Sequence, residues 1–125
     1  MEKIKHFIAL ISLAILCQSV QQLHETHITI ISPKVDVSYK NGQVVDVHFK
    51  VRCGEKLQKV VYTIADQNNK VLFSKNLTVA GKNAIEEKTT WTIIQTDPSV
   101  LTFSIEASDV DGHSSSNLVQ LNVNF

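Results

Sequence analysis

The sequence has few of the residues that interrupt regular structure or build a reaction centre. Its 125 residues include four glycines, two prolines and two cysteines. So few glycines leave little material for a phosphate-cradling loop, and no Gly-x-Ser-x-Gly elbow or His-Glu-x-x-His pair occurs. Because no nucleophile and base stand in a recognisable pattern, we predict a protein that is not an enzyme and uses no cofactor.

An excess of charge of either sign is also missing. Lysine and arginine total 12, and aspartate and glutamate total 12. Domains that bind nucleic acid or anionic membrane surfaces carry a basic excess, so we predict no nucleic-acid partner. Charged residues make up 19% and hydrophobic residues 43% of the chain, which is typical of a folded globular domain rather than a disordered segment.

The longest apolar run, residues 7–17, is too short to cross a membrane, which takes about 20 residues. Basic residues precede it, and this order is typical of an export signal. We predict a signal peptide over residues 1–19, cleaved after Ser19, and a secreted, periplasmic or cell-surface location. Two alternatives stay open: a lipid attached to Cys17, and an uncleaved anchor. The membrane is otherwise not an expected partner.

Cysteine pairing within the exported domain is excluded by the same prediction. Cys17 either leaves with the signal or carries the lipid, so Cys53 has no partner in its own chain. One interpretation of Cys53 is a small buried side chain at a strand end. The alternative is an intermolecular disulfide, so we expect either a monomer or a dimer linked through Cys53.

What the sequence does contain is a set of alternating segments, of which Val44–Cys53 is the clearest. From Val45 onward, the apolar residues fall on one parity, and the charged residues and His48 fall on the other. Successive side chains of a β-strand point to opposite faces, so this strand has one apolar and one polar face. The rest of the domain can be interpreted as supplying partners for the apolar face.

Similar segments follow a polar lead-in at residues 20–26, with turn residues between them and no amphipathic helix. The expected strands are 27–31, 35–39, 44–52, 57–66, 71–75, 89–94, 101–107 and 117–125. We expect 57–66 inside a sheet, 35–39 at an edge, and 76–88 to be irregular. The spacing predicts one all-β domain over residues 27–125, an Ig-like or fibronectin-III-like antiparallel β-sandwich of about seven strands.

Three segments carry a more specific pattern. They are residues 27–33, then Tyr39-Lys-Asn-Gly42 before a valine-rich strand, and residues 105–112 before a last strand that ends in phenylalanine. With this pattern, most of residues 24–125 resembles the small exported Ig-like proteins of Bacteroidetes-type bacteria. Members of that family largely have no assigned activity, so the resemblance implies a fold and a compartment rather than a reaction.

His24 and His27, in the run His-Glu-Thr-His, are candidate metal ligands because imidazole suits copper and zinc. Residues three apart in a strand point to opposite faces, so this pair needs an irregular lead-in. His48 can join them only if the first strand lies beside Val44–Cys53. The other interpretation is that His24 and His27 are simply exposed near the N-terminus.

The run Asp109-Val-Asp111-Gly resembles a fragment of a calcium loop. Calcium takes six to eight oxygen ligands, and two carboxylates fall far short of that number. We therefore predict a hairpin turn that Asp109 caps and in which Gly112 adopts positive φ.

Three other features have structural interpretations. Trp91 shares its parity with Ile93, so we expect it in the core, with a binding-surface role as the alternative. Glu86-Glu87-Lys88 is typical of a solvated loop. Asn76-Leu-Thr78 is a glycosylation sequon only if the source is eukaryotic.

These observations predict an exported, non-catalytic Ig-like module for binding, adhesion or structure at the cell surface or in the periplasm. Its partner, a protein or a surface, is unknown, and an edge strand or a loop is the expected contact. Residues 35–39 and 76–88 are the candidate contact segments. The alternative function is an extracytoplasmic metal-binding protein that uses His24, His27 and His48.

Overall fold

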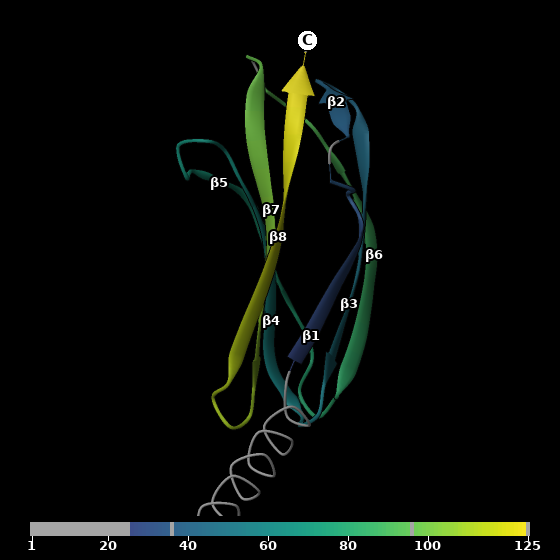
Figure 1. Ribbon diagram of the computed structural model, residues 1–125, viewed down its shortest axis with the longest axis vertical. Coiled ribbons are helices and arrows are strands. Elements are labelled where there is room, and N and C mark those ends of the chain that lie inside the picture. The colour runs from purple at the N-terminus through teal and green to yellow at the C-terminus, as the bar shows by residue number, and fades with distance from the viewer. Residues whose placement is uncertain (1–25, 36, 96, 125) are drawn as a thin grey trace, which may run out of the picture.

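The computed structural model describes residues 26–35, 37–95 and 97–124 as a sandwich of two β-sheets (Figure 1). The strands are β1 Thr26–Ser32, β2 Ser38–Lys40, β3 Val44–Cys53, β4 Leu57–Ala65, β5 Val71–Leu77, β6 Ala84–Thr92, β7 Ser99–Asp109 and β8 Ser114–Asn124. The expected all-β sandwich is confirmed. The predicted signal peptide, Cys17, Ser19 and His24 lie outside the described residues. Within them, no helix is long and apolar enough to span a bilayer.

The strands divide unevenly between the sheets. The smaller sheet has the order β1-β3-β6, and the larger has the order β2-β8-β7-β4-β5. Every pairing is antiparallel except that of β2 with β8, which is parallel. The chain passes from the smaller to the larger sheet between β1 and β2, at the cis peptide bond Ser32–Pro33. Strand β4 lies inside the larger sheet, as its sequence predicts.

The core forms on the inner face of β3. This strand pairs on both sides, and its buried residues alternate with exposed or half-buried ones as the sequence predicts. Phe49 is fully buried, with its ring centroid 5.4 Å from that of Tyr62 and 6.1 Å from that of Phe103. The aromatic centre therefore joins β3 of one sheet to β4 and β7 of the other.

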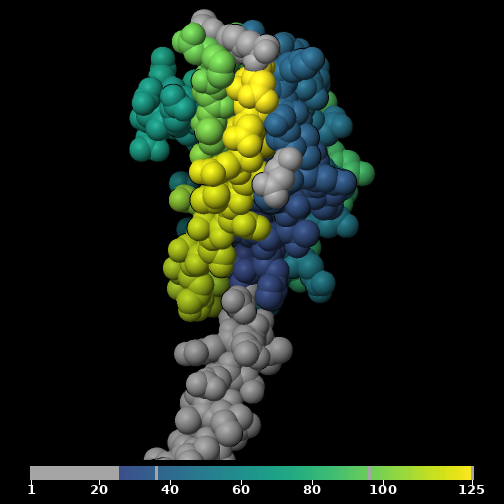
Figure 2. Space-filling model, turned by 45° about the horizontal axis from the view of Figure 1, so that its top comes forward, coloured from purple at the N-terminus to yellow at the C-terminus, as the bar shows by residue number. Residues whose placement is uncertain are grey.

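The two flanks of the sandwich differ. On the closed flank, β2 pairs with β8, and the Asn117 side-chain amide donates to the Ile28 carbonyl oxygen across 3.1 Å. Figure 2 shows β8 lying against the early strands on this side. On the open flank, β5 and β6 belong to different sheets and do not pair. There Lys75 Nζ lies 3.2 Å from Glu87 Oε2, which bridges the sheets.

The structure corrects the expectations for residues 35–39 and 76–88. The edge strand is β2, residues 38–40, because the chain is still crossing between the sheets at Val35 and Val37, which are exposed. Residues 76–88 are not irregular throughout, since β5 ends at Leu77 and β6 begins at Ala84. The run Glu86-Glu87-Lys88 therefore lies in a strand. Its charges are tolerated because β6 is at the edge of its sheet.

Candidate functional site

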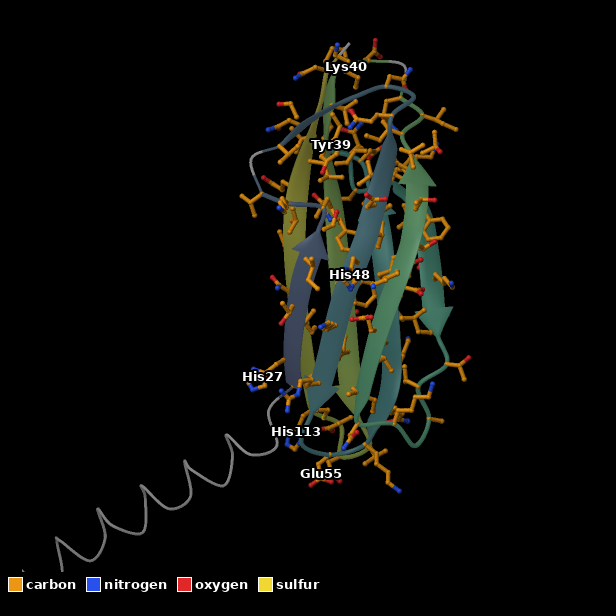
Figure 3. The ribbon with its side chains drawn as sticks, turned by 90° about the vertical axis from the view of Figure 1, so that its right-hand side faces the viewer. His27, Tyr39, Lys40, His48, Glu55 and His113 are labelled. Atoms are coloured by element: carbon orange, nitrogen blue, oxygen red, sulfur yellow. The ribbon has the colours of Figure 1, made fainter. Side chains whose placement is uncertain are left out.

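The first strand does lie beside β3, but its register separates the histidines. His27 is opposite Arg52, whereas His48 is opposite Ser32. The two histidines share the outer face but stand four residues apart along β3, about 13 Å at the usual rise. Figure 3 shows His27 at one end of the sheet and His48 near its middle. The expected pairing of His27 with His48 is therefore wrong, although the expected strand neighbour is right.

His48 instead contacts a carboxylate on β6. Its Nε2 lies 3.3 Å from Glu86 Oε2 without forming a hydrogen bond. Lys50 Nζ is 3.5 Å from the same oxygen, and Lys88 Nζ is 3.9 Å from Glu86 Oε1. These neighbours, the His48 contact first, hold the pKa of Glu86 below its ordinary value. One carboxylate facing three nitrogen-bearing side chains is a surface ion-pair network, not a set of metal ligands.

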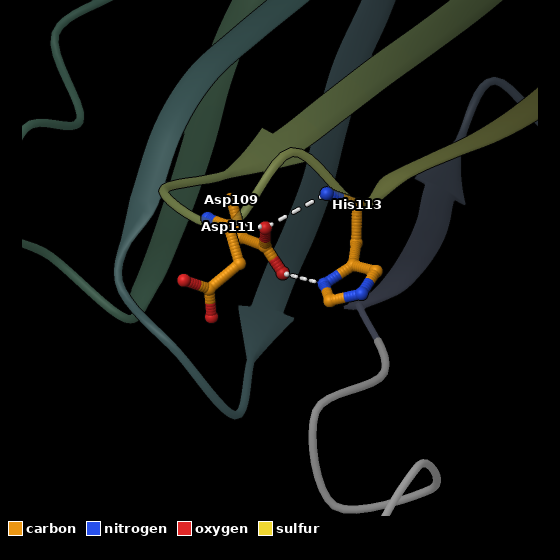
Figure 4. A group of neighbouring side chains, drawn as sticks. All are labelled: Asp109, Asp111 and His113. Carbon is orange, nitrogen blue, oxygen red and sulfur yellow. Dashed lines mark hydrogen bonds and ion pairs between the residues drawn. The ribbon is translucent and has the colours of Figure 1, made fainter.

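The β7–β8 turn has the capped geometry that the sequence predicts. Asp109 Oδ1 accepts hydrogen bonds from the backbone N–H groups of Asp111 and His113, both at 2.9 Å, and Gly112 has φ of 87°. Asp109 Oδ2 lies 3.1 Å from His113 Nδ1 (Figure 4). Burial would raise the pKa of Asp109, but the hydrogen bonds from His113 and Asp111 hold it below its ordinary value. His113 is a partner that the sequence reasoning missed, and the Asp-x-x-x-His spacing was its signal.

Asp109, Asp111 and His113 also place three possible ligand atoms within 4.8 Å of one another. Both oxygens of Asp109 already accept hydrogen bonds within the turn. With one ligand atom from each residue, the side chains supply two oxygens and a nitrogen, so calcium, which takes about six to eight oxygens, would need at least four more. The arrangement is therefore explained by the turn it stabilises.

Cys53 and Trp91 both lie on the core side of their strands. Cys53 is buried, and the Thr26 hydroxyl donates to its Sγ across 3.4 Å. An intermolecular disulfide stays a prediction, and it would require this sulfur to be uncovered. Trp91 packs partly buried against the core, and its other side faces solvent at the open flank. Trp91 therefore packs against the core, as expected, and part of its side chain is exposed at the surface.

A hollow that the sequence reasoning missed lies on the outer face of the larger sheet. We call it the serine hollow, and its volume is about 340 Å³. Two cross-strand rows form it from β4, β7 and β8. The rows are Lys59–Ser108–Ser114 and Val61–Glu106–Ser116, and Ala107 and Ser115 complete the lining. The run of three serines at the start of β8 was the available signal.

No protein-family model and no curated protein matches the sequence. The chain is similar in structure to an engineered protein, with 17% identity, a TM-score of 0.54, and coverage of 81% of this chain and 20% of that one. It is also similar to Spo0M, a sporulation control protein from Bacillus subtilis (10% identity, TM-score 0.52, 81% and 49% coverage). A third similar structure is the CARDB domain of a Pyrococcus furiosus protein in complex with di-metal ions. It has 10% identity and a TM-score of 0.51, and the match covers 81% of this chain and 89% of that one.

These similarities concern the fold of the protein. At such low identities they show the fold alone, and the fold is that of a β-sandwich domain. The chain spans one fifth of the engineered protein and about half of Spo0M.

Proposed function

We propose that the chain is an exported, non-catalytic binding module that recognises an extended segment of a partner protein by strand addition at β6. Strand β6 pairs with β3 over nine consecutive residues, and no described strand pairs with its other edge. An exposed strand edge offers a row of backbone donors and acceptors to an incoming strand. This free edge is the observation that carries the proposal.

The second half of β6 suits an incoming strand better than the first half. Residues 86–88 are charged, and charges on an edge oppose strand pairing. Residues 89–92, Thr-Thr-Trp-Thr, are uncharged and of high β-propensity. At this end the β4–β5 hairpin bends away from the smaller sheet (Figure 1). An apolar side chain of the partner would pack beside the half-buried Trp91.

Export and the lack of catalysis rest on the sequence. A basic stretch and a short apolar run begin the chain, and no nucleophile–base pattern follows. The resemblance to small exported Ig-like proteins supports the same compartment. Metal binding through His24, His27 and His48 has less support, because the β1–β3 register keeps His27 away from His48.

The edge is tested with Thr89→Pro and Thr90→Pro. Consecutive residues of an antiparallel strand direct their N–H groups to opposite edges. One substitution therefore removes a hydrogen bond to β3 and lowers the melting temperature, and the other blocks only the free edge. Peptides are first selected for binding to the wild-type chain from a displayed library of random dodecapeptides. We expect the well-folded proline variant to bind them at least tenfold more weakly by calorimetry.

Val37→Pro is the control, because it alters the chain before the other predicted edge, β2. Binding that survives Val37→Pro and is lost in the folded β6 variant supports the proposal. Binding that the folded β6 variant retains contradicts it. If only Val37→Pro abolishes binding, the partner contacts β2 rather than β6.

A further inference from the structure

The serine hollow exists because small side chains stand between long ones. Ser108 and Ser114 continue the row that begins with Lys59, and Ser116 is next to Glu106. Serine side chains are short, whereas the lysine and glutamate side chains extend well beyond them. A depression therefore forms over the serines, and three adjacent strands hold its floor.

The polar groups of the hollow have no partners within the protein. Among the described residues, the hydroxyls of Ser108, Ser114 and Ser116 form no hydrogen bond, and neither Lys59 nor Glu106 forms an ion pair. The other polar clusters differ in this respect. Both oxygens of the Asp109 carboxylate accept hydrogen bonds in the turn, and the Glu86 carboxylate lies within 4 Å of nitrogen atoms of His48, Lys50 and Lys88. The hollow gathers five polar side chains, those of Lys59, Glu106, Ser108, Ser114 and Ser116, that are available to solvent or to a ligand.

We propose that the serine hollow binds a neutral polyhydroxylated ligand, a mono- or disaccharide. Serine hydroxyls both donate and accept, the Lys59 ammonium only donates, and an ionised Glu106 carboxylate only accepts. This mixture matches the hydroxyls of a sugar, each of which is also donor and acceptor. The half-buried Val61 offers an apolar surface to the C–H groups of a sugar ring.

Charge and size agree with this class of ligand. Lys59 and Glu106 carry opposite charges, so an anion would meet the carboxylate and a cation would meet the ammonium. A neutral ligand avoids both penalties. The volume of about 340 Å³ lies at the lower end of the range for small-molecule sites, about 300–1,000 Å³.

This site does not depend on strand addition at β6. The hollow lies on the outer face of the larger sheet, and β6 is an edge of the smaller one. Failure of either proposal therefore leaves the other in place, and each has its own variants.

The test is a titration of the ¹⁵N-labelled full chain, followed by amide chemical shifts. The probes are glucose, N-acetylglucosamine, cellobiose and maltose, with inorganic phosphate, glycine and calcium as comparison ligands. We expect saturable shifts with at least one sugar, centred on residues 106–108 and 114–116. Ser114→Ala combined with Ser116→Ala, and separately Glu106→Gln, should each weaken the binding at least fivefold.

Gln120→Ala is the matched control, because Gln120 is exposed on the same face of β8 but outside the hollow. It should leave the affinity unchanged. The proposal is overturned if no sugar produces saturable shifts in the hollow, or if the serine and Glu106 variants bind as the wild type does. Saturation by phosphate, glycine or calcium without any response to sugars would also overturn it, since the hollow would then be a site for ions.

Discussion

The closed flank and the open flank bound the same core, yet they are held by different interactions. Backbone pairing of β2 with β8 and the hydrogen bond from Asn117 to Ile28 close one side. On the other side, β5 and β6 do not pair with each other, and the ion pair Lys75–Glu87 bridges them. An ion pair with a solvent-exposed partner, here Lys75, contributes little to stability. We therefore expect stability to be concentrated on the closed flank, where the chain crosses between the sheets.

The largest expected effect comes from a cavity near the closed flank. Leu121 on β8 is 1% exposed, so Leu121→Ala should lower the free energy of unfolding by about 2–5 kcal/mol. Trp91→Ala at the open flank should cost less although tryptophan is larger, because Trp91 is only partly buried. Urea denaturation measures both. An equal or greater loss for Trp91→Ala would contradict the proposed difference between the flanks.

The turn between β7 and β8 should give the next effect, because it positions the strand that closes the sandwich. Asp109→Ala leaves two backbone N–H groups and His113 without their acceptor, so we expect a larger loss than for the single bond of Asn117. The pKa of Asp109 is lowered in the folded state. Its stabilisation is therefore complete above the unfolded pKa, about 3.9, and is lost as pH falls through the folded value.

Acid denaturation checks the turn prediction. The stability of the wild type should fall more steeply below about pH 4 than that of Asp109→Asn, which cannot ionise. Identical acid profiles would show that the Asp109 carboxylate is not held ionised by the turn.

A smaller effect is expected for Asn117→Ala. The variant loses one hydrogen bond to the Ile28 carbonyl, which contributes about 0.5–1.5 kcal/mol in a typical protein. Amide exchange in β1 should accelerate at the same time, because its contact with β8 is weakened. Asn76→Ala, at an exposed position on β5, is the control on the open flank. If Asn117→Ala and Asn76→Ala lower the free energy of unfolding by similar amounts, the two flanks do not differ in stability.

The smallest effect is expected when the open-flank ion pair is removed. Lys75→Met should change the unfolding midpoint less than Asn117→Ala does. The bond to Glu87 raises the pKa of Lys75. The contribution of the pair is therefore present below the unfolded pKa, about 10.4, and is lost as pH rises through the folded value. As pH rises above about 10.4, the wild type should lose more stability than Lys75→Met, and parallel curves would show that the bridge contributes nothing.

Local patterns were predictable from the sequence. The alternation in β3, β7 and β8 indicates strands with one apolar face. The Asp109 turn depends on residues within five positions of one another. The run Glu86-Glu87-Lys88 was interpreted as a solvated loop because it is a cluster of charges, yet it lies in β6 with Glu87 on the inner parity. That residue is tolerated because Lys75, from a strand of the other sheet, reaches it.

Relations between strands could not be predicted in the same way. The sequence analysis named adjacency of β1 and β3 as the condition for His27 and His48 to meet. The strands are adjacent, but the register that moves His27 away from His48 depends on how the whole strand packs. The serine hollow needs three strands aligned so that two short rows meet, and no single segment contains that information. Sites made within a turn are therefore accessible to sequence reasoning, whereas sites made across a sheet require the structure.

The parallel pairing of β2 with β8 has a mechanical consequence. Strand β8 ends at one end of the sandwich and β1 begins at the other (Figure 1). A force that pulls these two ends apart would slide β2 and β8 along each other, with their hydrogen bonds across the direction of pull. The backbone hydrogen bonds along the register from Ser38–Asn122 to Lys40–Asn124 would then be loaded together rather than opened one by one. Under such a load, the closed flank would resist separation of the two ends by shear between β2 and β8.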